Sequence, residues 1–147
     1  MDFINNIFTW IYEKWFYYED YRELLSIVFE SKDFAVIGFG LFLVSLTVLF
    51  AFYKAIDPVE SQRLKWWAAL IINSLLSFGL TYLILYNNQG LLTAITNYDG
   101  NGVDPEYFIF RISCISFLYA FILAILLCIF QLPVRFFSTN NTKLKII

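Results

Sequence analysis

Histidine is absent from this chain and cysteine is nearly so, with two residues among 147. Without imidazole, the usual zinc and haem ligand sets are missing, and so is the commonest general base. Cys114 and Cys128 lie on one predicted helix, about 21 Å apart along its axis, so they cannot form a disulfide with each other. The apolar parts of the chain supply hydroxyl and thiol groups but no base near them. We therefore predict no catalytic residue, no cofactor, no metal site and no enzymatic activity.

Basic charge is also scarce. Ten Lys and Arg residues are outnumbered by twelve Asp and Glu residues, which gives a net charge of −2. Nucleic-acid binding needs basic residues that cluster on one face of the protein. We therefore exclude nucleic acid as a partner.

Charge is missing altogether from three long apolar stretches, residues 34–53, 66–86 and 112–132. Hydrophobic residues make up 60% of the chain, and its mean hydropathy is +0.67. A helix of about 20 residues crosses a hydrocarbon core of roughly 30 Å, and a charge at its centre costs about 2.5–3.5 kcal/mol. We therefore predict an all-α, polytopic integral membrane protein with three transmembrane helices.

Capping residues indicate where two of these helices begin. Asp57-Pro58 and Asp104-Pro105 each place an N-cap residue before a proline that suits the first helical position. The chain then divides into three spans near 34–54, 58–87 and 105–132, which make up a transmembrane domain over 34–132, and a short basic tail over 133–147.

Residues 1–33 are predicted to form one or two amphipathic helices at the membrane interface. The apolar side chains share one helical face: Ile4, Ile7, Phe8, Ile11 and Trp15. The polar ones lie opposite: Asp2, Asn5, Asn6, Thr9 and Glu13. Trp10 and Trp15 suit the membrane–water boundary, and Asp20 followed by Glu23 resembles a capping box that would start a second helix over 21–29. These helices either lie on the bilayer and orient the first span, or dock their aromatic face onto another subunit.

Small and polar residues spaced by four form a ridge on each of the last two spans. The ridge residues are Ala69, Asn73, Ser77 and Thr81 on the second span, and Ser116, Ala120, Ala124 and Cys128 on the third. Small residues at this spacing let helix backbones approach closely, and Asn or Ser can hydrogen-bond across the contact. The two ridges either face each other within one chain, or the polar one faces a symmetry mate or lines a narrow pore.

Arg111 lies at the outer edge of the third span, within about two helical turns of Asp104 and Glu106. We expect it to anchor the helix with a partly exposed ion pair, or to latch onto the outer domain of a partner. The preceding loop, residues 99–104, contains two glycines and predicts a tight turn that leads into the Asp104 cap.

The basic residues give a modest indication of orientation. With the amino terminus outside, six Lys and Arg residues would lie inside and four outside, a bias in the direction of the positive-inside rule. We therefore expect the amino terminus outside and the carboxyl terminus inside. The Phe-, Ile- and Asn-rich composition suits an AT-rich bacterial genome, and hence the bacterial inner membrane.

Two functions remain open for such a chain. The favoured one is a non-catalytic membrane subunit that acts through helix–helix packing in a larger complex, with the bilayer and either itself or other membrane subunits as partners. The alternative is a homo-oligomeric pore-forming or membrane-disrupting effector, such as a holin-like or defence protein. Its polar wall would be Asn73, Ser77 and Thr81. The three apolar stretches hold none of the ionisable residues that proton relays and ion-coupled carriers use.

Overall fold

The computed structural model describes residues 2–16, 18–55, 62–100 and 102–129. Within these ranges the chain forms helices and no strand, as predicted for an all-α protein. The helices are α1 (Asp2–Glu13), α2 (Tyr18–Glu30), α3 (Asp33–Ala55), α4 (Gln62–Tyr86), α5 (Gln89–Thr96) and α6 (Pro105–Ile129).

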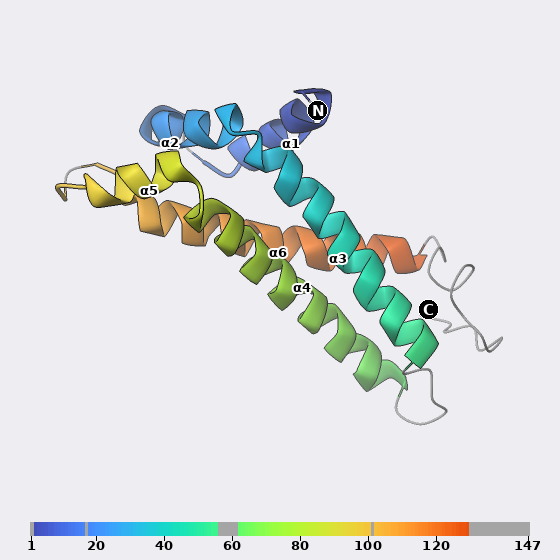
Figure 1. Cartoon of the computed structure of the whole chain (residues 1–147). Coiled ribbons are helices and arrows are strands. Elements are labelled where there is room, and N and C mark those ends of the chain that lie inside the picture. Colours follow the sequence, from blue (N-terminus) through green and yellow to red (C-terminus); the bar gives the residue numbers. More distant parts are fainter. Residues whose placement is uncertain (1, 17, 56–61, 101, 130–147) are drawn as a thin grey trace.

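Three long helices, α3, α4 and α6, form the body of the molecule, and α4 packs most extensively against α6 (Figure 1). Their segments Asp33–Phe52, Leu64–Tyr86 and Pro105–Ile129 are long and apolar enough to cross a membrane. This agrees with the three predicted spans, and insertion into a bilayer remains a prediction. The helices α1, α2 and α5 lie together at one end of the body (Figure 1).

Two hydrophobic clusters fill the interior. The first lies under α1 and α2 and joins them to the long helices through buried side chains that include Tyr12, Phe34, Ile37, Phe108 and Ile112. The second lies at the other end of the bundle and includes Leu49, Phe52, Trp66, Leu70 and Ala124. The amino-terminal segment therefore shares one core with the bundle.

The predicted start is correct for one helix and wrong for another. α6 begins at Pro105 as predicted, and the Asp104 Oδ1 atom accepts a hydrogen bond from the Glu106 backbone N–H at 2.9 Å. α2 begins at Tyr18, so Asp20 lies inside its first turn, and the predicted capping box is wrong. The predicted start of the second span, near 58, lies outside the described residues.

The short helix α5 was not predicted. Asn88 caps it, because the Asn88 side-chain oxygen accepts a hydrogen bond from the Leu91 backbone N–H at 3.1 Å. Its Leu91 side chain is fully buried in the first cluster. Through this leucine, the connection between α4 and α6 packs onto the end of the bundle.

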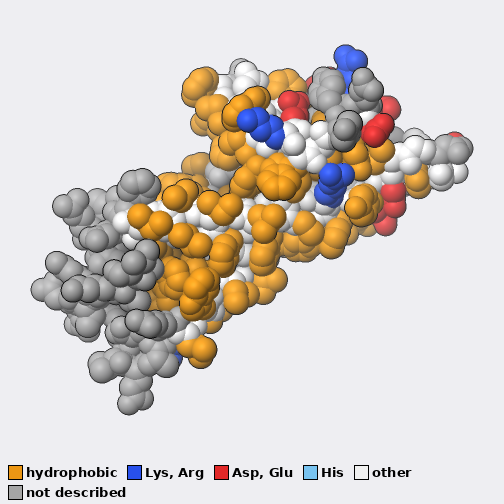
Figure 2. Space-filling view, turned by 180° about the vertical axis from the view of Figure 1, so that it is seen from behind, with side chains coloured by type: hydrophobic (Ala, Val, Ile, Leu, Met, Phe, Trp, Pro, Cys, Tyr) orange, Lys and Arg blue, Asp and Glu red, His pale blue; other side chains and the backbone are white. Residues whose placement is uncertain are grey.

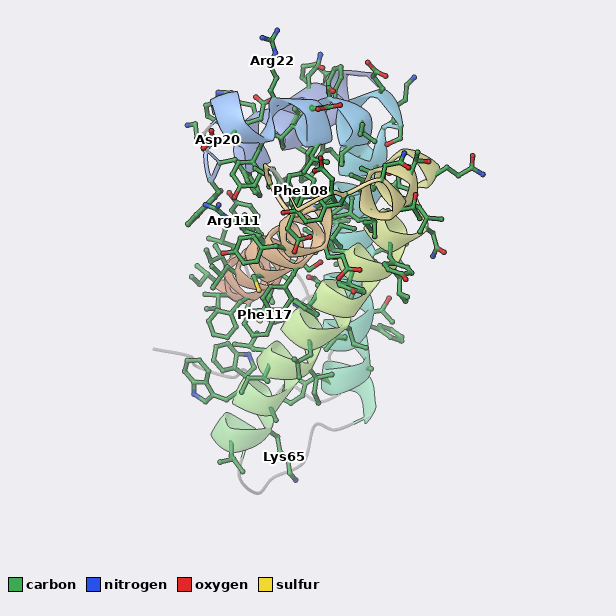
Figure 3. All side chains as sticks on the ribbon, turned by 90° about the vertical axis from the view of Figure 1, so that its left-hand side faces the viewer. Asp20, Arg22, Lys65, Phe108, Arg111 and Phe117 are labelled. Atoms are coloured by element: carbon green, nitrogen blue, oxygen red, sulfur yellow. The ribbon has the colours of Figure 1, made fainter. Side chains whose placement is uncertain are left out.

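Charged side chains in the described part of the chain gather at the end built by α1, α2 and α5 (Figure 2). Among the labelled residues, Asp20, Arg22 and Arg111 lie toward this end, and Lys65 lies at the opposite one (Figure 3). Between the two ends the surface is largely hydrophobic (Figure 2). This distribution fits a bundle whose middle faces hydrocarbon.

Candidate functional site

The inward face of α1 carries polar side chains beside aromatic ones. Asn5 and Thr9 are buried next to Tyr12 and Phe8, which pack in the first cluster, whereas Phe3, Ile4 and Trp10 are exposed, Phe3 to 77%. A helix in water buries its apolar face, but a helix beside lipid gains nothing by doing so. The structure therefore favours an α1 whose outer face contacts lipid or another protein.

Asn5 explains why polar residues of α1 face inward. Its Nδ2 atom donates to the Phe29 carbonyl oxygen at 3.0 Å, and its Oδ1 atom accepts from the Ala35 backbone N–H at 3.2 Å. The same two groups also bond to the Lys32 backbone, the Phe29 carbonyl to its N–H at 3.0 Å and the Ala35 N–H to its carbonyl at 3.1 Å. A single amide side chain thus adds one hydrogen bond on each side of the corner between α2 and α3.

Glycine lets α1 come close to α3. A Cβ atom placed on Gly38 would lie 2.2 Å from the ring of Phe8, so no larger residue fits without displacing that ring. Ala35 and Gly38 both lie within about 8 Å of Asp33 along the α3 axis. α1 therefore packs against the first turns of α3, just beyond the last charged residue before that span.

The second half of α1 is fixed to the middle of α6. The Tyr12 hydroxyl lies 2.6 Å from the Ser116 Oγ atom, and the Tyr119 hydroxyl donates to the Ile11 carbonyl oxygen at 3.1 Å. The Trp15 indole N–H donates to the same Tyr119 hydroxyl. Burial raises the pKa of Tyr12 far above its usual value, so the phenol stays neutral.

Arg111 takes part in this attachment and forms no ion pair with Asp104 or Glu106. Its guanidinium donates to the Trp15 carbonyl oxygen at 2.8 Å and to the Tyr21 hydroxyl at 3.1 Å. The same group lies 4.7 Å from the ring centroid of Phe16, a cation–π distance. Arg111 therefore holds the connection between α1 and α2 against α6.

The structure places the predicted ridge residues inside the chain, between α4 and α6. Asn73, Ser77, Thr81, Ser116, Ala120 and Ala124 have no exposed surface, and Ala69 is 7% exposed. The Asn73 Nδ2 atom donates to the Ala120 carbonyl oxygen at 3.0 Å, so this amide reaches a backbone group of the facing helix. The Asn73 Oδ1 and Ser77 Oγ atoms are buried and have no hydrogen-bond partner among the described residues.

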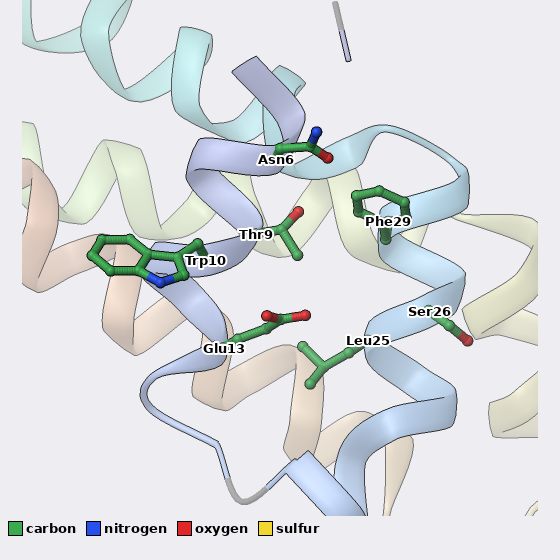
Figure 4. A pocket seen from close by; sticks show the side chains of 7 residues that line it. All are labelled: Asn6, Thr9, Trp10, Glu13, Leu25, Ser26 and Phe29. Carbon is green, nitrogen blue, oxygen red and sulfur yellow. The ribbon is translucent and has the colours of Figure 1, made fainter. Parts of the chain in front are cut away.

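Two polar cavities lie at the charged end. One, of about 350 Å³, separates α1 from α2 and is lined by Asn6, Thr9, Trp10, Glu13, Leu25, Ser26 and Phe29 (Figure 4). We call it the α1–α2 groove. Burial raises the pKa of the Glu13 carboxyl above its usual value. In Figure 4 this side chain extends from α1 toward α2.

The second cavity, of about 540 Å³, lies between α2, α5 and the loop before α6. Its acidic lining residues are Asp20, Glu23 and Asp99. Gly100 and Gly102 adopt φ angles of 87° and 85°, which confirms the predicted glycine turn. No group of three or more potential metal-ligating side chains occurs in the described parts of the chain.

Trp10 and Trp15, the predicted interfacial residues, behave differently from each other. Trp15 is bound to α6 through Tyr119, whereas the Trp10 ring is 60% exposed and carries the Lys14 Nζ atom 3.5 Å from its centroid. Sequence reasoning missed Asn5, Tyr12 and Tyr119. One signal in the sequence could have indicated that Asn5 is buried. Asn5 and Thr9 are polar but uncharged, so both can lie inside the protein if they form hydrogen bonds.

Comparisons with protein families, with curated proteins and with solved structures find no match to this chain. Functional inference therefore rests on the residues and their geometry.

Proposed function

We propose that this protein is a non-catalytic integral membrane subunit that acts through helix–helix contacts in a larger membrane complex. The observation that carries this proposal is a pair of apolar hollows on the outer faces of the long helices. One hollow, of about 450 Å³, is lined by Leu75, Phe78, Phe110, Cys114, Phe117 and Leu118 of α4 and α6. The other, of about 290 Å³, is lined by Val48, Ala51, Phe52, Lys65, Ala68, Ala69 and Ile72 of α3 and α4.

Shape matters more than polarity at such a surface. Between lipid-exposed helices there is little hydrophobic driving force, so association depends on close packing and on interhelical hydrogen bonds. The serine and asparagine side chains described in the three long helices are buried inside the chain, as Asn73 and Ser116 illustrate, whereas Thr47 is exposed. Contacts with a partner would therefore be made by side chains of a neighbouring helix that fill the hollows.

The burial of Asn73, Ser77 and Thr81 weighs against the pore-forming alternative. A water-filled path needs polar groups that line it, or hydrophobic constrictions that gate it. These three side chains have no exposed surface in the single chain. An oligomer that used them as a pore wall would first have to separate α4 from α6, which form the most extensive contact among the described helices.

Site-directed photo-crosslinking in cells tests the subunit proposal. A photoreactive residue at Leu118, in the larger hollow, is compared with one at Leu83, which is exposed but lines neither hollow. We expect one discrete product of higher mass from position 118 and diffuse lipid labelling from position 83. Native mass measurement of the complex in mild detergent then gives its stoichiometry. Equal labelling from both positions, with a monomeric native mass, would contradict the proposal.

Membrane potential distinguishes the pore alternative. A voltage-sensitive dye is followed after induction of the wild-type chain and of the Asn73→Leu, Ser77→Leu double variant. A subunit without its partners should leave the potential unchanged in both. Rapid depolarisation by the wild type that the double variant abolishes would favour the pore.

A further inference from the structure

We infer that the α1–α2 groove binds an alkylammonium group, such as the amine of a lipid headgroup. This inference is independent of the proposed function, because it concerns a surface that neither the outer hollows nor the α4–α6 contact includes. The groove volume of about 350 Å³ falls at the lower end of the roughly 300–1,000 Å³ typical of small-molecule sites.

The hydroxyl groups of the groove can only accept hydrogen bonds from a ligand. The Thr9 hydroxyl donates its hydrogen to the Asn5 carbonyl oxygen at 2.7 Å, and the Ser26 hydroxyl donates its hydrogen to the Glu23 carbonyl oxygen at 2.7 Å. Each hydroxyl has one hydrogen, so only oxygen lone pairs remain for the groove. These two hydroxyls therefore suit a cation, whereas the Asn6 amide and the Trp10 indole, which also line the groove, carry N–H donors.

Glu13 supplies a charge that no described cation neutralises. It forms no ion pair in the described part of the chain, and the neighbouring Lys14 holds its Nζ atom over the Trp10 ring instead. A partly buried carboxylate without a partner is unfavourable. An ammonium group in the groove would pair with it through charge-assisted hydrogen bonds.

An aromatic ring borders the same space. Phe29 projects from α2 toward α1, whereas Trp10 extends on the side of α1 away from α2, where its ring carries the Lys14 ammonium (Figure 4). Aromatic faces attract ammonium groups, as cation–π contacts do generally. A divalent metal would instead need several oxygen ligands with more negative charge than one carboxylate provides. The chemistry of the groove therefore favours an organic cation.

The position of the groove indicates a lipid as the nearest source. Through Asn5 and Phe8, α1 lies against Ala35 and Gly38, within about 8 Å of the charged residue that opens α3 and near the level where headgroups would meet that helix. Its second half reaches the middle of α6. The outer face of α1 presents Phe3, Ile4 and Ile7, which are exposed and apolar. An acyl chain could lie along this face while its amine enters the groove.

Native mass spectrometry of the full chain in non-ionic detergent tests the inference. Phosphatidylethanolamine and phosphatidylglycerol are titrated separately, the second as an anionic lipid that lacks an amine. We expect the amine lipid to bind about tenfold more tightly, and Glu13→Gln to remove this preference, since one charge-assisted contact is lost. Glu106→Gln, an exposed carboxylate outside the groove, is the matched control and should keep the preference.

Two further measurements complete the test. Phe29→Leu keeps an apolar side chain but removes the aromatic face, so we expect about a threefold loss of affinity. This variant tests the groove even if Glu13→Gln does not fold normally. Free ethanolamine is added as a competitor. Displacement of the lipid means that the site accepts soluble amines as well; no displacement means that the acyl chain contributes to binding. Equal retention of both lipids by the wild type, or an unchanged preference in Glu13→Gln, would overturn the inference.

Discussion

Replacing Asn5 by alanine should release α1 from the corner between α2 and α3. The Asn5 amide satisfies the Phe29 carbonyl and the buried Ala35 N–H, at 3.0 and 3.2 Å. Both backbone groups keep a hydrogen bond to Lys32, at 3.0 and 3.1 Å, so the variant loses two hydrogen bonds but leaves neither group unsatisfied. At about 0.5–1.5 kcal/mol for each bond, we expect a total loss of about 1–3 kcal/mol. This is a large fraction of the roughly 5–15 kcal/mol that stabilises a typical domain.

Asn6 provides a matched control for this variant. It is the next residue of the same helix and has the same side chain, but it is exposed and forms no hydrogen bond with the described residues. Asn6→Ala should therefore change stability by less than about 0.5 kcal/mol. Two adjacent asparagines should thus differ strongly, although sequence periodicity places both on the polar face of α1.

The assay should separate local release of α1 from global unfolding, because the two need not coincide. Thermal unfolding in non-ionic detergent, followed by circular dichroism, reports the bundle. Amide hydrogen exchange over residues 2–16 reports α1, and we expect Asn5→Ala to accelerate exchange there most. If Asn5→Ala and Asn6→Ala had equal and small effects, α1 would not be held by its inward polar face, and the reasoning would fail.

Three more perturbations test the attachment of α1. A double-mutant cycle of Tyr12→Phe and Ser116→Ala should give a coupling energy of about 1 kcal/mol in thermal or denaturant unfolding, because their hydroxyls lie 2.6 Å apart in a buried site; additive effects would refute the bond. Arg111→Lys should lower stability by about 1–2 kcal/mol, since an ammonium cannot reproduce the planar guanidinium that bonds to Trp15; an unchanged melting temperature would contradict this. Burial raises the pKa of the Glu13 carboxyl, so the folded state favours its protonated form. The free energy of unfolding therefore gains a contribution that is fully present below the unfolded pKa of about 4.5. That contribution is lost as the pH rises through the higher pKa of the folded state. Glu13→Gln should therefore be more stable than the wild type at neutral pH in amine-free detergent, with the difference vanishing below about pH 4.5 in melting curves; a gain that persists in acid would refute the assignment.

The three long helices could be predicted from sequence because their signal is local. Length, apolar character and the absence of charge are properties of a contiguous stretch, and they need no knowledge of neighbours. The same holds for the start of α6, where Asp104 and Pro105 act on adjacent backbone groups. α5 was missed because its eight residues are too few for a reliable periodic pattern, and its burial depends on Leu91 meeting a distant core.

The candidate site was much less accessible to sequence reasoning. Tyr12 and Ser116 are 104 residues apart in the chain, and nothing in either local sequence indicates that they meet. The four-residue ridge did identify side chains that lie between α4 and α6. It did not indicate that Asn73 would bond to the backbone of Ala120. A ridge specifies which residues share a face, whereas the partner depends on the register of the facing helix.

The orientation of α1 shows how the surrounding solvent changes the meaning of an amphipathic pattern. Periodicity separates Asn5 and Thr9 from Ile4 and Ile7, but it does not say which set turns inward. In water the apolar set would be buried, since burial of apolar area drives folding. Beside hydrocarbon the apolar set can face outward at no loss, and the amide and hydroxyl instead gain hydrogen bonds inside the protein, as Asn5 does at the corner of α2 and α3. The burial of Asn5 and Thr9, beside the exposure of Ile4 and Ile7, thus supports the prediction that this end of the molecule is in contact with a membrane.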